Sequence, residues 1–422
     1  MNTKNYFFTL ITLFCALVNT SFSQTHEVEL NNLIADALKN NPEVRMMKSK
    51  IESADNRIPQ NSNLPDPNLS IGLVNLPVNS FSFTQEPMTG KMISLTQGIP
   101  FPGKLSANED FMKMDVKISN EELNETINKI KLKVSGLYYE LSYLRKSIMI
   151  SGEMQSLLKD ISEVVRTKYS VNEASQENVL KVDLAITQID NKISGLRSQE
   201  NVIVRTFKNL LYYEPEFTFI DSLLNGTLDT LSYSGNQLSI TEKNRPVLRQ
   251  IKLLEEKSNL MENLADFDFY PDFKVTVQYN QRDRLASTDT DLKDFLSVIF
   301  GVSIPINYGG KKSAKINEAR SLSDYYKNQY DSYLQMISIA EESSKAKISS
   351  FLEREKLITE GLLNQAAHTF QSALAGYQVG QLDFINVIDA VNKQLDIETE
   401  LYRIRADYFE ETANLKYQLG IL

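Results

Sequence analysis

A stretch that ends in Ile-Pro and then turns at glycine and lysine occurs twice, at 94–105 and at 302–312. Each copy begins with alternating apolar and polar residues and opens a long polar helical segment. Proline cannot pair within a strand ladder, and glycine lets the chain turn. Each copy is therefore predicted to join a strand to a helix. The predicted turn residues are Pro100, Pro102, Gly103, Pro305, Gly309 and Gly310.

The duplication extends beyond these two junctions. Asn41-Pro42 is echoed by Arg245-Pro246, and Pro65-Asp66 by Pro271-Asp272, at an offset of about 204 to 208 residues. We predict a first structural repeat at 24–212 and a second at 241–422, each with a helix, two strands and a long helical hairpin. An irregular linker is predicted at 213–240, which contains Pro215, Gly226 and Gly235.

The N-terminus has the pattern of a signal peptide, predicted at 1–23. Lys4 supplies a positive charge, and an apolar segment of about a dozen residues follows, which is too short to span a bilayer. The mature chain is expected to begin at Gln24. Cys15, the only cysteine, would leave with the signal, so neither a disulfide nor a cysteine-bound zinc is expected in the mature protein.

The net charge of −9 and the lack of basic runs exclude a nucleic-acid-binding protein, for which a Lys/Arg face is expected. The segment from Gly98 to Leu105 superficially resembles a phosphate loop. However, Leu105 replaces the required Ser/Thr, and Pro100 and Pro102 have no amide hydrogens to donate. No nucleophile, paired carboxylates or metal-ligand spacing stands out. We predict no enzyme, no cofactor and no metal site.

Apolar residues recur every three or four positions through two long segments that contain no proline, 106–168 and 179–210. The steps sum to a seven-residue repeat, which is the pattern of a coiled coil. In the segment 179–210, Glu200 is the one charged residue that interrupts this apolar pattern. The second half repeats the arrangement over 313–375 and 384–419. We expect long antiparallel helices there.

Four segments alternate between apolar and polar residues and are each expected to form a strand of nine to eleven residues, the length that a tilted membrane strand requires. In the first segment, Leu69, Ile71 and Leu73 are apolar and would lie on one face of the strand. Four strands cannot close a membrane barrel, and lipid does not tolerate an open sheet edge. Either the strands form a soluble sheet, or several chains share one barrel. Three chains would give twelve strands.

Four short segments are typical of one protein family: Asn41-Pro42-Glu43, 97–105, Tyr377-Gln378-Val379-Gly380 and Val387-Ile388-Asp389-Ala390. On the basis of these segments, nearly all of the mature chain resembles the TolC-type outer-membrane efflux proteins. The segments 64–67 and 100–104 are most similar to the heavy-metal (CzcC/CusC-like) branch. The resemblance implies a mainly α fold with four β-strands per protomer, and a homotrimer with a shared 12-stranded barrel in outer-membrane lipid. It also implies a periplasmic α-barrel that docks on a periplasmic adaptor protein and an inner-membrane efflux pump.

The same resemblance implies roles for the two helical reversals and for one helix face. The reversals would contact the adaptor, where a Val-Gly pair in the family is matched by Val379 and Gly380. The contact set is Val171, Asn172, Val379, Gly380 and Gln381. A plain reading is that glycine and asparagine only supply the backbone freedom that a loop needs. Asp389 matches an acidic gate position. Asn386 and Leu382 depart from the family, which has an acid and an arginine there.

The residue patterns, together with this resemblance, leave two functions open. The first is an outer-membrane exit duct of a tripartite efflux system, conducting heavy-metal cations or drugs. The second is a periplasmic coiled-coil adaptor or scaffold whose strands form a small soluble domain. Long strands in each repeat, linked by polar loops, favour the duct. The cargo is not fixed by the sequence, because pore-lining residues act collectively.

Overall fold

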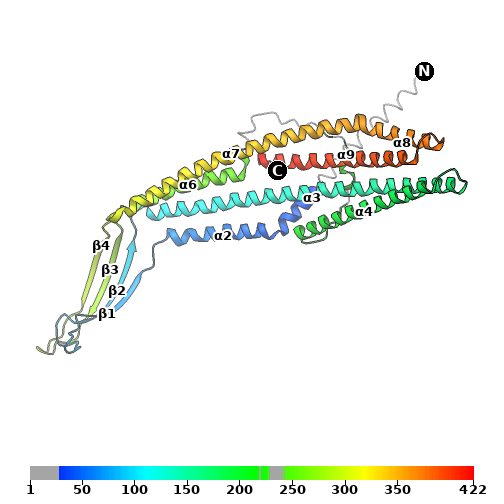
Figure 1. The fold of residues 1–422 in the computed structure, drawn as a ribbon. Coiled ribbons are helices and arrows are strands. Elements are labelled where there is room, and N and C mark those ends of the chain that lie inside the picture. The colour runs from blue at the N-terminus through cyan, green and yellow to red at the C-terminus, as the bar shows by residue number, and fades with distance from the viewer. Residues whose placement is uncertain (1–27, 218–219, 227, 229–240, 242) are drawn as a thin grey trace, which may run out of the picture. The chain divides into compact units, whose positions relative to one another are not determined.

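A computed structural model describes residues 28–217, 220–226, 228, 241 and 243–422 (Figure 1). The predicted signal peptide, 1–23, lies outside these residues, as does part of the predicted linker, 213–240. The expectation of a mainly helical chain with four strands is confirmed. Among the described residues, no helix combines the length and the apolar character needed to cross a bilayer.

The first half contains a helix at 28–40, then α2 (Pro42–Ser62), β1 (Asn68–Val74), β2 (Gly90–Ile99), α3 (Lys104–Ser170) and α4 (Gln176–Leu211). A short 3₁₀ helix, η1 (Ile220–Asn225), follows. The second half contains α6 (Pro246–Phe267), β3 (Phe273–Gln281), β4 (Phe295–Val302), the 3₁₀ turn η2 (Tyr308–Gly310), α7 (Lys311–Leu357), the π turn η3 (Ile358–Leu362), α8 (Leu363–Gln378) and α9 (Phe384–Leu419).

The chain divides into two compact units. The helical unit comprises the described residues within Met1–Met46, Leu123–Pro246 and Leu334–Leu422. The sheet unit comprises Met47–Glu122 and Val247–Tyr333. Each unit therefore draws on both halves of the chain.

The sheet is antiparallel throughout, in the order β1-β2-β3-β4. Its register aligns apolar residues across the strands: Leu95 lies between Leu69 and Val277, and Val277 also pairs with Val298. Because side chains alternate between faces along a strand, this register gathers the apolar residues of all four strands on one face.

Two strands are shorter than the predicted nine to eleven residues. β1 has seven residues and β4 has eight. β1 ends because Asn75 adopts a left-handed conformation with φ of 54°. β4 ends at Val302, two residues before Ile304, and Pro305 beyond has no amide hydrogen for a ladder. The predicted strands were longer because they included the apolar residues that follow the ends of β1 and β4.

The core of the helical unit follows the predicted seven-residue repeat. Ile130, Val134, Leu141 and Leu144 of α3 are buried, with at most 4% of their surface exposed, and Phe207 and Leu211 of α4 are fully buried. Full burial of such a side chain stabilises the fold by about 1.5–3 kcal/mol. The charged interruption, Glu200, accepts a hydrogen bond from Arg145 Nε at 2.9 Å, so its charge is compensated.

The second half departs from the prediction of one continuous helix over 313–375, because η3 interrupts it. Ile358 and Ala366 are buried, although eight residues separate them rather than the seven that separate Ala366 from Ala373. A π turn holds one extra residue per turn. The π turn therefore accommodates the extra residue, so the same face of the helix stays buried before and after it.

In the first half, α2 continues through Pro59 to Ser62, although proline usually interrupts a helix. Side-chain amides donate to carbonyls in these last turns: Gln60 Nε2 to Asn56 O and Asn63 Nδ2 to Pro59 O, both at 2.8 Å. These bonds satisfy carbonyls that the end of a helix leaves without an amide partner.

Candidate functional site

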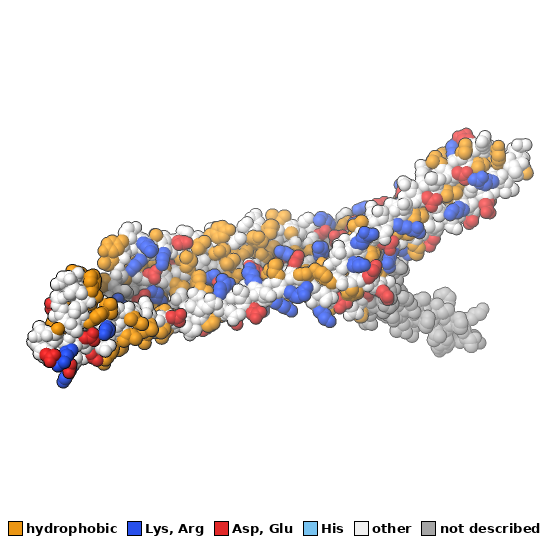
Figure 2. Space-filling model, turned by 90° about the horizontal axis from the view of Figure 1, so that it is seen from below, with side chains coloured by type: hydrophobic (Ala, Val, Ile, Leu, Met, Phe, Trp, Pro, Cys, Tyr) orange, Lys and Arg blue, Asp and Glu red, His pale blue; other side chains and the backbone are white. Residues whose placement is uncertain are grey.

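The apolar face of the sheet is uncovered. Except for the half-buried Val275, its large apolar side chains are between 37% (Phe273) and 80% (Ile71) exposed. They are Leu69, Ile71, Leu73, Ile93, Leu95, Ile99, Phe273, Val277, Tyr279, Leu296, Val298, Phe300 and Val302. Hydrophobic side chains gather at the left end of Figure 2, where Figure 1 places the strands.

The opposite face is mostly polar. It carries Ser94, Thr96, Thr276 and Ser297, and the hydroxyls of Thr96 and Thr276 lie 2.9 Å apart. Val74, Met92, Phe295 and Ile299 are the apolar exceptions. A soluble sheet packs its apolar face against its own core, and contiguous exposed apolar patches of this kind mark interaction sites. The uncovered face is thus suited to an apolar medium or a partner.

The first strand-to-helix junction is closely packed. Gly103 has φ of 91°, and a Cβ there would lie 3.3 Å from the Phe267 ring. The Phe101 ring stacks on Tyr270 with a centroid distance of 4.7 Å. Pro100 precedes this turn and Pro102 lies within it. The junction is a rigid connection between β2 and α3.

Asp272 ties this junction to the start of β3. Its Oδ1 accepts a hydrogen bond from Phe101 N at 2.9 Å, and its Oδ2 accepts one from Lys104 Nζ at 3.0 Å. Partial burial opposes ionisation of Asp272, but these two donors outweigh it and lower the pKa of the carboxyl. The repeat in the sequence matches Asp272 to Asp66, but nothing in the sequence predicted these contacts.

The second junction is more open. Gly309 and Gly310 have φ of 58° and 73°, and nothing lies within 4 Å of a Cβ built on either. Asn307 Oδ1 accepts a hydrogen bond from Lys312 N at 2.9 Å at the start of α7. Pro305 follows the end of β4. The predicted turn residues thus all lie at the two strand-to-helix connections.

The two helical reversals also use different residues. Between α3 and α4, Asn172 has φ of 61° and Glu173 N donates to Lys168 O at 2.8 Å. Between α8 and α9, Gly380 has φ of 75° and Gln381 N donates to Gly376 O at 2.8 Å. Val171 and Val379 are both exposed. Each reversal therefore presents a valine next to a left-handed residue.

Lys168 connects the two reversals. Its Nζ donates to Gln378 O at 3.2 Å and lies 5.2 Å from the centre of the Tyr377 ring. Tyr377 packs against Phe384, and burial raises its pKa, against the opposing effect of the nearby Asn178 amide. A cleft of about 400 Å³ lies among these residues. Sequence reasoning missed this link, because the residues lie about two hundred positions apart.

Asp389 and Asn386 lie on one exposed stripe of α9 with Lys393, Asp396 and Glu400. Asn386 Nδ2 donates to Asp383 O at 3.1 Å, so this amide is bound to the backbone within the first turn of its own helix. Lys192 approaches Asp396 at 3.7 Å and Arg354 pairs with Glu400 at 2.9 Å. Asp389 has no ion pair among the described residues.

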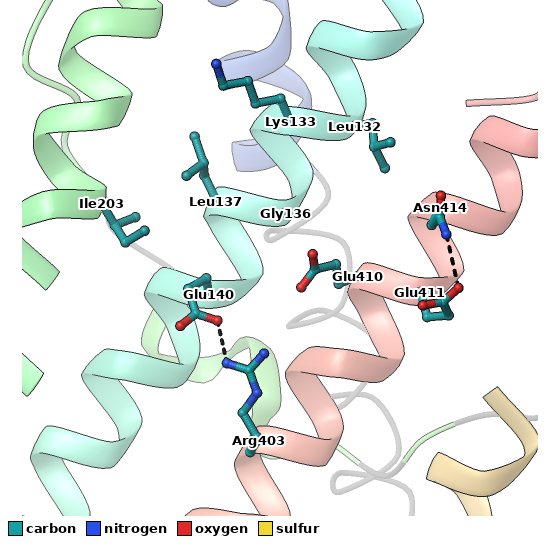
Figure 3. A pocket seen from close by; sticks show the side chains of 10 residues that line it. All are labelled: Leu132, Lys133, Gly136, Leu137, Glu140, Ile203, Arg403, Glu410, Glu411 and Asn414. Carbon is teal, nitrogen blue, oxygen red and sulfur yellow. Dashed lines mark hydrogen bonds and ion pairs between the residues drawn. The ribbon is translucent and has the colours of Figure 1, made fainter. Parts of the chain in front are cut away.

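A polar cleft of about 570 Å³ lies between α3 and α9 (Figure 3). Arg403 spans it to Glu140 and also pairs with Asp407 on its own helix. Burial opposes the charge of Arg403, but these two carboxylates raise its pKa. Desolvation and the nearby carboxylates raise the pKa of Glu410, against the opposing effect of Arg403. The described residues contain no group of three His, Cys, Asp or Glu side chains that could hold a metal ion. The cleft lies where neighbouring helices of the same unit pack together.

No family model and no curated protein sequence matches this chain. Solved structures match it over almost their whole length. The outer membrane protein VceC from Vibrio cholerae superposes with a TM-score of 0.76 at 16% identity, over 94% of this chain and 98% of that one. The chain shares its fold with this outer-membrane protein. The CmeC outer membrane channel from Campylobacter jejuni gives 0.75 at 15% identity, over 93% and 85%.

CusC, whose structures concern folding and transmembrane channel formation, gives a TM-score of 0.76 at 16% identity, over 93% of this chain and 92% of that chain. VceC and CusC are thus equally similar to the chain by this measure. The likeness extends to the helices and the sheet together, and it does not distinguish a heavy-metal branch from the others.

Proposed function

We propose that this protein is the outer-membrane exit duct of a tripartite efflux system, extending from the outer membrane into the periplasm. The observation that carries the proposal is the uncovered apolar face of the four-stranded sheet, which includes Ile71 and Phe300. Lipid would cover this face as hydrocarbon covers the outside of a membrane barrel. The similarity of the fold to outer-membrane channels supports the same reading.

Three copies would complete the barrel. The strand order leaves β1 and β4 at the two edges of the sheet. Unpaired edges are not tolerated in lipid. Pairing β1 of one copy with β4 of the next removes them, and three copies give the twelve strands of a shared barrel. The helices of the same homotrimer would form the conduit through the periplasm.

The mass of the purified particle tests this proposal. We expect the protein to require detergent for extraction and native mass spectrometry to give three chains. A mature protein that is soluble as a monomer without detergent would contradict the duct. That result would favour the periplasmic adaptor or scaffold, which the exposed sheet face argues against.

The two reversals are proposed to bind a periplasmic adaptor protein, which links the duct to an inner-membrane efflux pump. Val171, Asn172, Val379, Gly380 and Gln381 all lie exposed there. We expect Val379→Asp to weaken binding of the cognate adaptor by about tenfold or more, because a charge at the centre of an apolar contact is costly. Val202→Asp, at an exposed site on α4, is the matched control. Equal binding by both variants would sink the assignment.

Asp389 is proposed to form a ring of three carboxylates at the gate, with Asn386 one turn closer to the reversal. Such a ring would attract cations. We expect Asp389→Asn to lower the cation-over-anion permeability ratio in planar bilayers. Asp396→Asn, on the same stripe but close to Lys192, should change it less. An unchanged ratio in Asp389→Asn would remove this residue from the gate.

The cargo is proposed to be a heavy-metal cation, with a drug as the alternative. The resemblance of 64–67 and 100–104 to the heavy-metal branch supports the cation. Loss of the gene should then lower tolerance to transition-metal salts. A strain that loses tolerance only to organic drugs would favour the alternative, while leaving the duct itself intact.

A further inference from the structure

The two loops that leave the same end of the sheet differ in charge. The loop between β1 and β2, residues 75–89, holds a single charged residue, Glu86. The loop between β3 and β4, residues 282–294, holds seven. Lys91 near the start of β2 pairs with Gln281 at the end of β3, so the two loops lie at the same end of the sheet. One loop is therefore highly charged, and the other is almost without charge.

The loop at 75–89 exposes apolar side chains. Val78 is 87% exposed, Phe81 68% and Met88 55%. Phe81 also has φ of 51°, a left-handed conformation that is unusual for a bulky residue. The hydrogen bond from Phe81 N to Pro77 O at 2.8 Å holds this turn. Strained backbone that the surrounding structure holds in place points to a function for the displayed side chain.

Hydrogen bonds fix the loop at its base and along its length. Thr89 Oγ1 donates to Asn75 O at 2.8 Å, and Asn75 Nδ2 donates to Met88 O at 3.1 Å. Ala286 N of the charged loop donates to Thr84 O at 2.9 Å. The exposure of Val78 and Phe81 is therefore built into the loop, with the charged loop as its support.

We propose that Val78, Phe81 and Met88 form a knob that inserts into the acyl region of the membrane around the mouth of the barrel. This inference rests on the proposed function. β1 carries Leu69, Ile71 and Leu73 on the exposed apolar face and runs directly into this loop, so the knob continues the surface assigned to lipid. Each trimer would then carry three lipid-inserted loops alternating with three charged loops in water.

Tryptophan fluorescence provides the test, because the chain contains no tryptophan. Single-tryptophan variants of the full trimer are reconstituted in phosphatidylcholine vesicles with and without brominated acyl chains. Phe81→Trp probes the knob, and Val78→Trp replaces it if the strained site rejects the larger ring. Ile71→Trp probes the sheet face, and Ser287→Trp probes the charged loop.

We expect brominated lipid to quench Phe81→Trp to an extent comparable with Ile71→Trp, and aqueous iodide to quench only Ser287→Trp. Iodide quenching of Phe81→Trp and Val78→Trp, with Ile71→Trp still quenched by lipid, would overturn the knob and leave the duct standing. Loss of lipid quenching in Ile71→Trp would overturn the proposed function itself. Shielding of the knob only after a protein partner is added would also overturn lipid insertion.

Discussion

The hairpin formed by α3 and α4 and the hairpin formed by α7, α8 and α9 bury similar apolar seams, but their backbones differ. In the first, the helices are uninterrupted and the seam follows the seven-residue repeat through Val134 and Leu141. In the second, η3 takes up one additional residue between Ile358 and Ala366. A change in chain length is thus accommodated within a turn, and the buried face is preserved.

The ends of the two hairpins show the same contrast. Tyr212, with φ of 63°, caps the C-terminus of α4, and Gly420, with φ of 72°, caps the C-terminus of α9. A Cβ on Gly420 would lie 2.6 Å from the carbonyl carbon of Asn244, whereas Tyr212 is exposed. Both halves require a left-handed residue, and local crowding decides which residue can supply it.

Deleting one glycine from each hairpin gives the strongest test of this comparison. Deleting Gly195 from α4 rotates the following seam by about 100° and turns Phe207 and Leu211 away from the core. We expect a loss of several kcal/mol, of the order of losing a large buried side chain. Deleting Gly361 from η3 converts the π turn to α-helix and should be nearly neutral. Thermal unfolding followed by circular dichroism measures both, and equal losses would contradict the register argument.

The helix ends give the next largest effect. Gly420→Ala places a methyl group against the Asn244 backbone and holds alanine at positive φ, so we expect a cost of about 1–3 kcal/mol. Tyr212→Gly relieves a left-handed side-chain penalty and should be neutral or stabilising by about 1 kcal/mol. Chemical denaturation compares the two. A tolerated Gly420→Ala would mean that α9 can end differently.

Lys168 offers a smaller test, because it links the hairpins that the comparison treats separately. Lys168→Met removes the hydrogen bond to Gln378 and the contact with the Tyr377 ring, which together contribute about 0.5–1 kcal/mol. We expect faster amide hydrogen exchange at 376–382. Lys159→Met, higher on the same helix, is the control. Unchanged exchange in Lys168→Met would show that the reversals are held by packing alone.

The smallest effect is expected at the echoed aspartates. Asp272 has a lowered pKa, so its contribution to stability is present above the pKa of the unfolded chain, near 3.9, and is lost as the pH falls through the lower folded value. Asp272→Asn should therefore destabilise the protein at pH 7 and make no difference in strong acid. Asp66→Asn is the control, since Asp66 is exposed and forms no ion pair among the described residues. Parallel pH profiles for the two variants would contradict the role of Asp272.

The sequence by itself determined the helices, the strands and the turns between them. Periodicity and punctuation are local properties, so the seam through Val134 and Leu141 and the turns at Gly103 and Gly309 could be predicted. The contact residues of the reversals, Val171 and Val379, came instead from the resemblance to the efflux family.

Only the tertiary structure decided the strand register, the π turn and the contacts of Asp272 and Lys168. Each depends on residues far apart in the chain meeting at a particular distance. The π turn reflects a mismatch of one residue that becomes visible only against the partner helix. The uncovered sheet face likewise required the structure, because an apolar strand pattern does not state whether the chain's own core covers it.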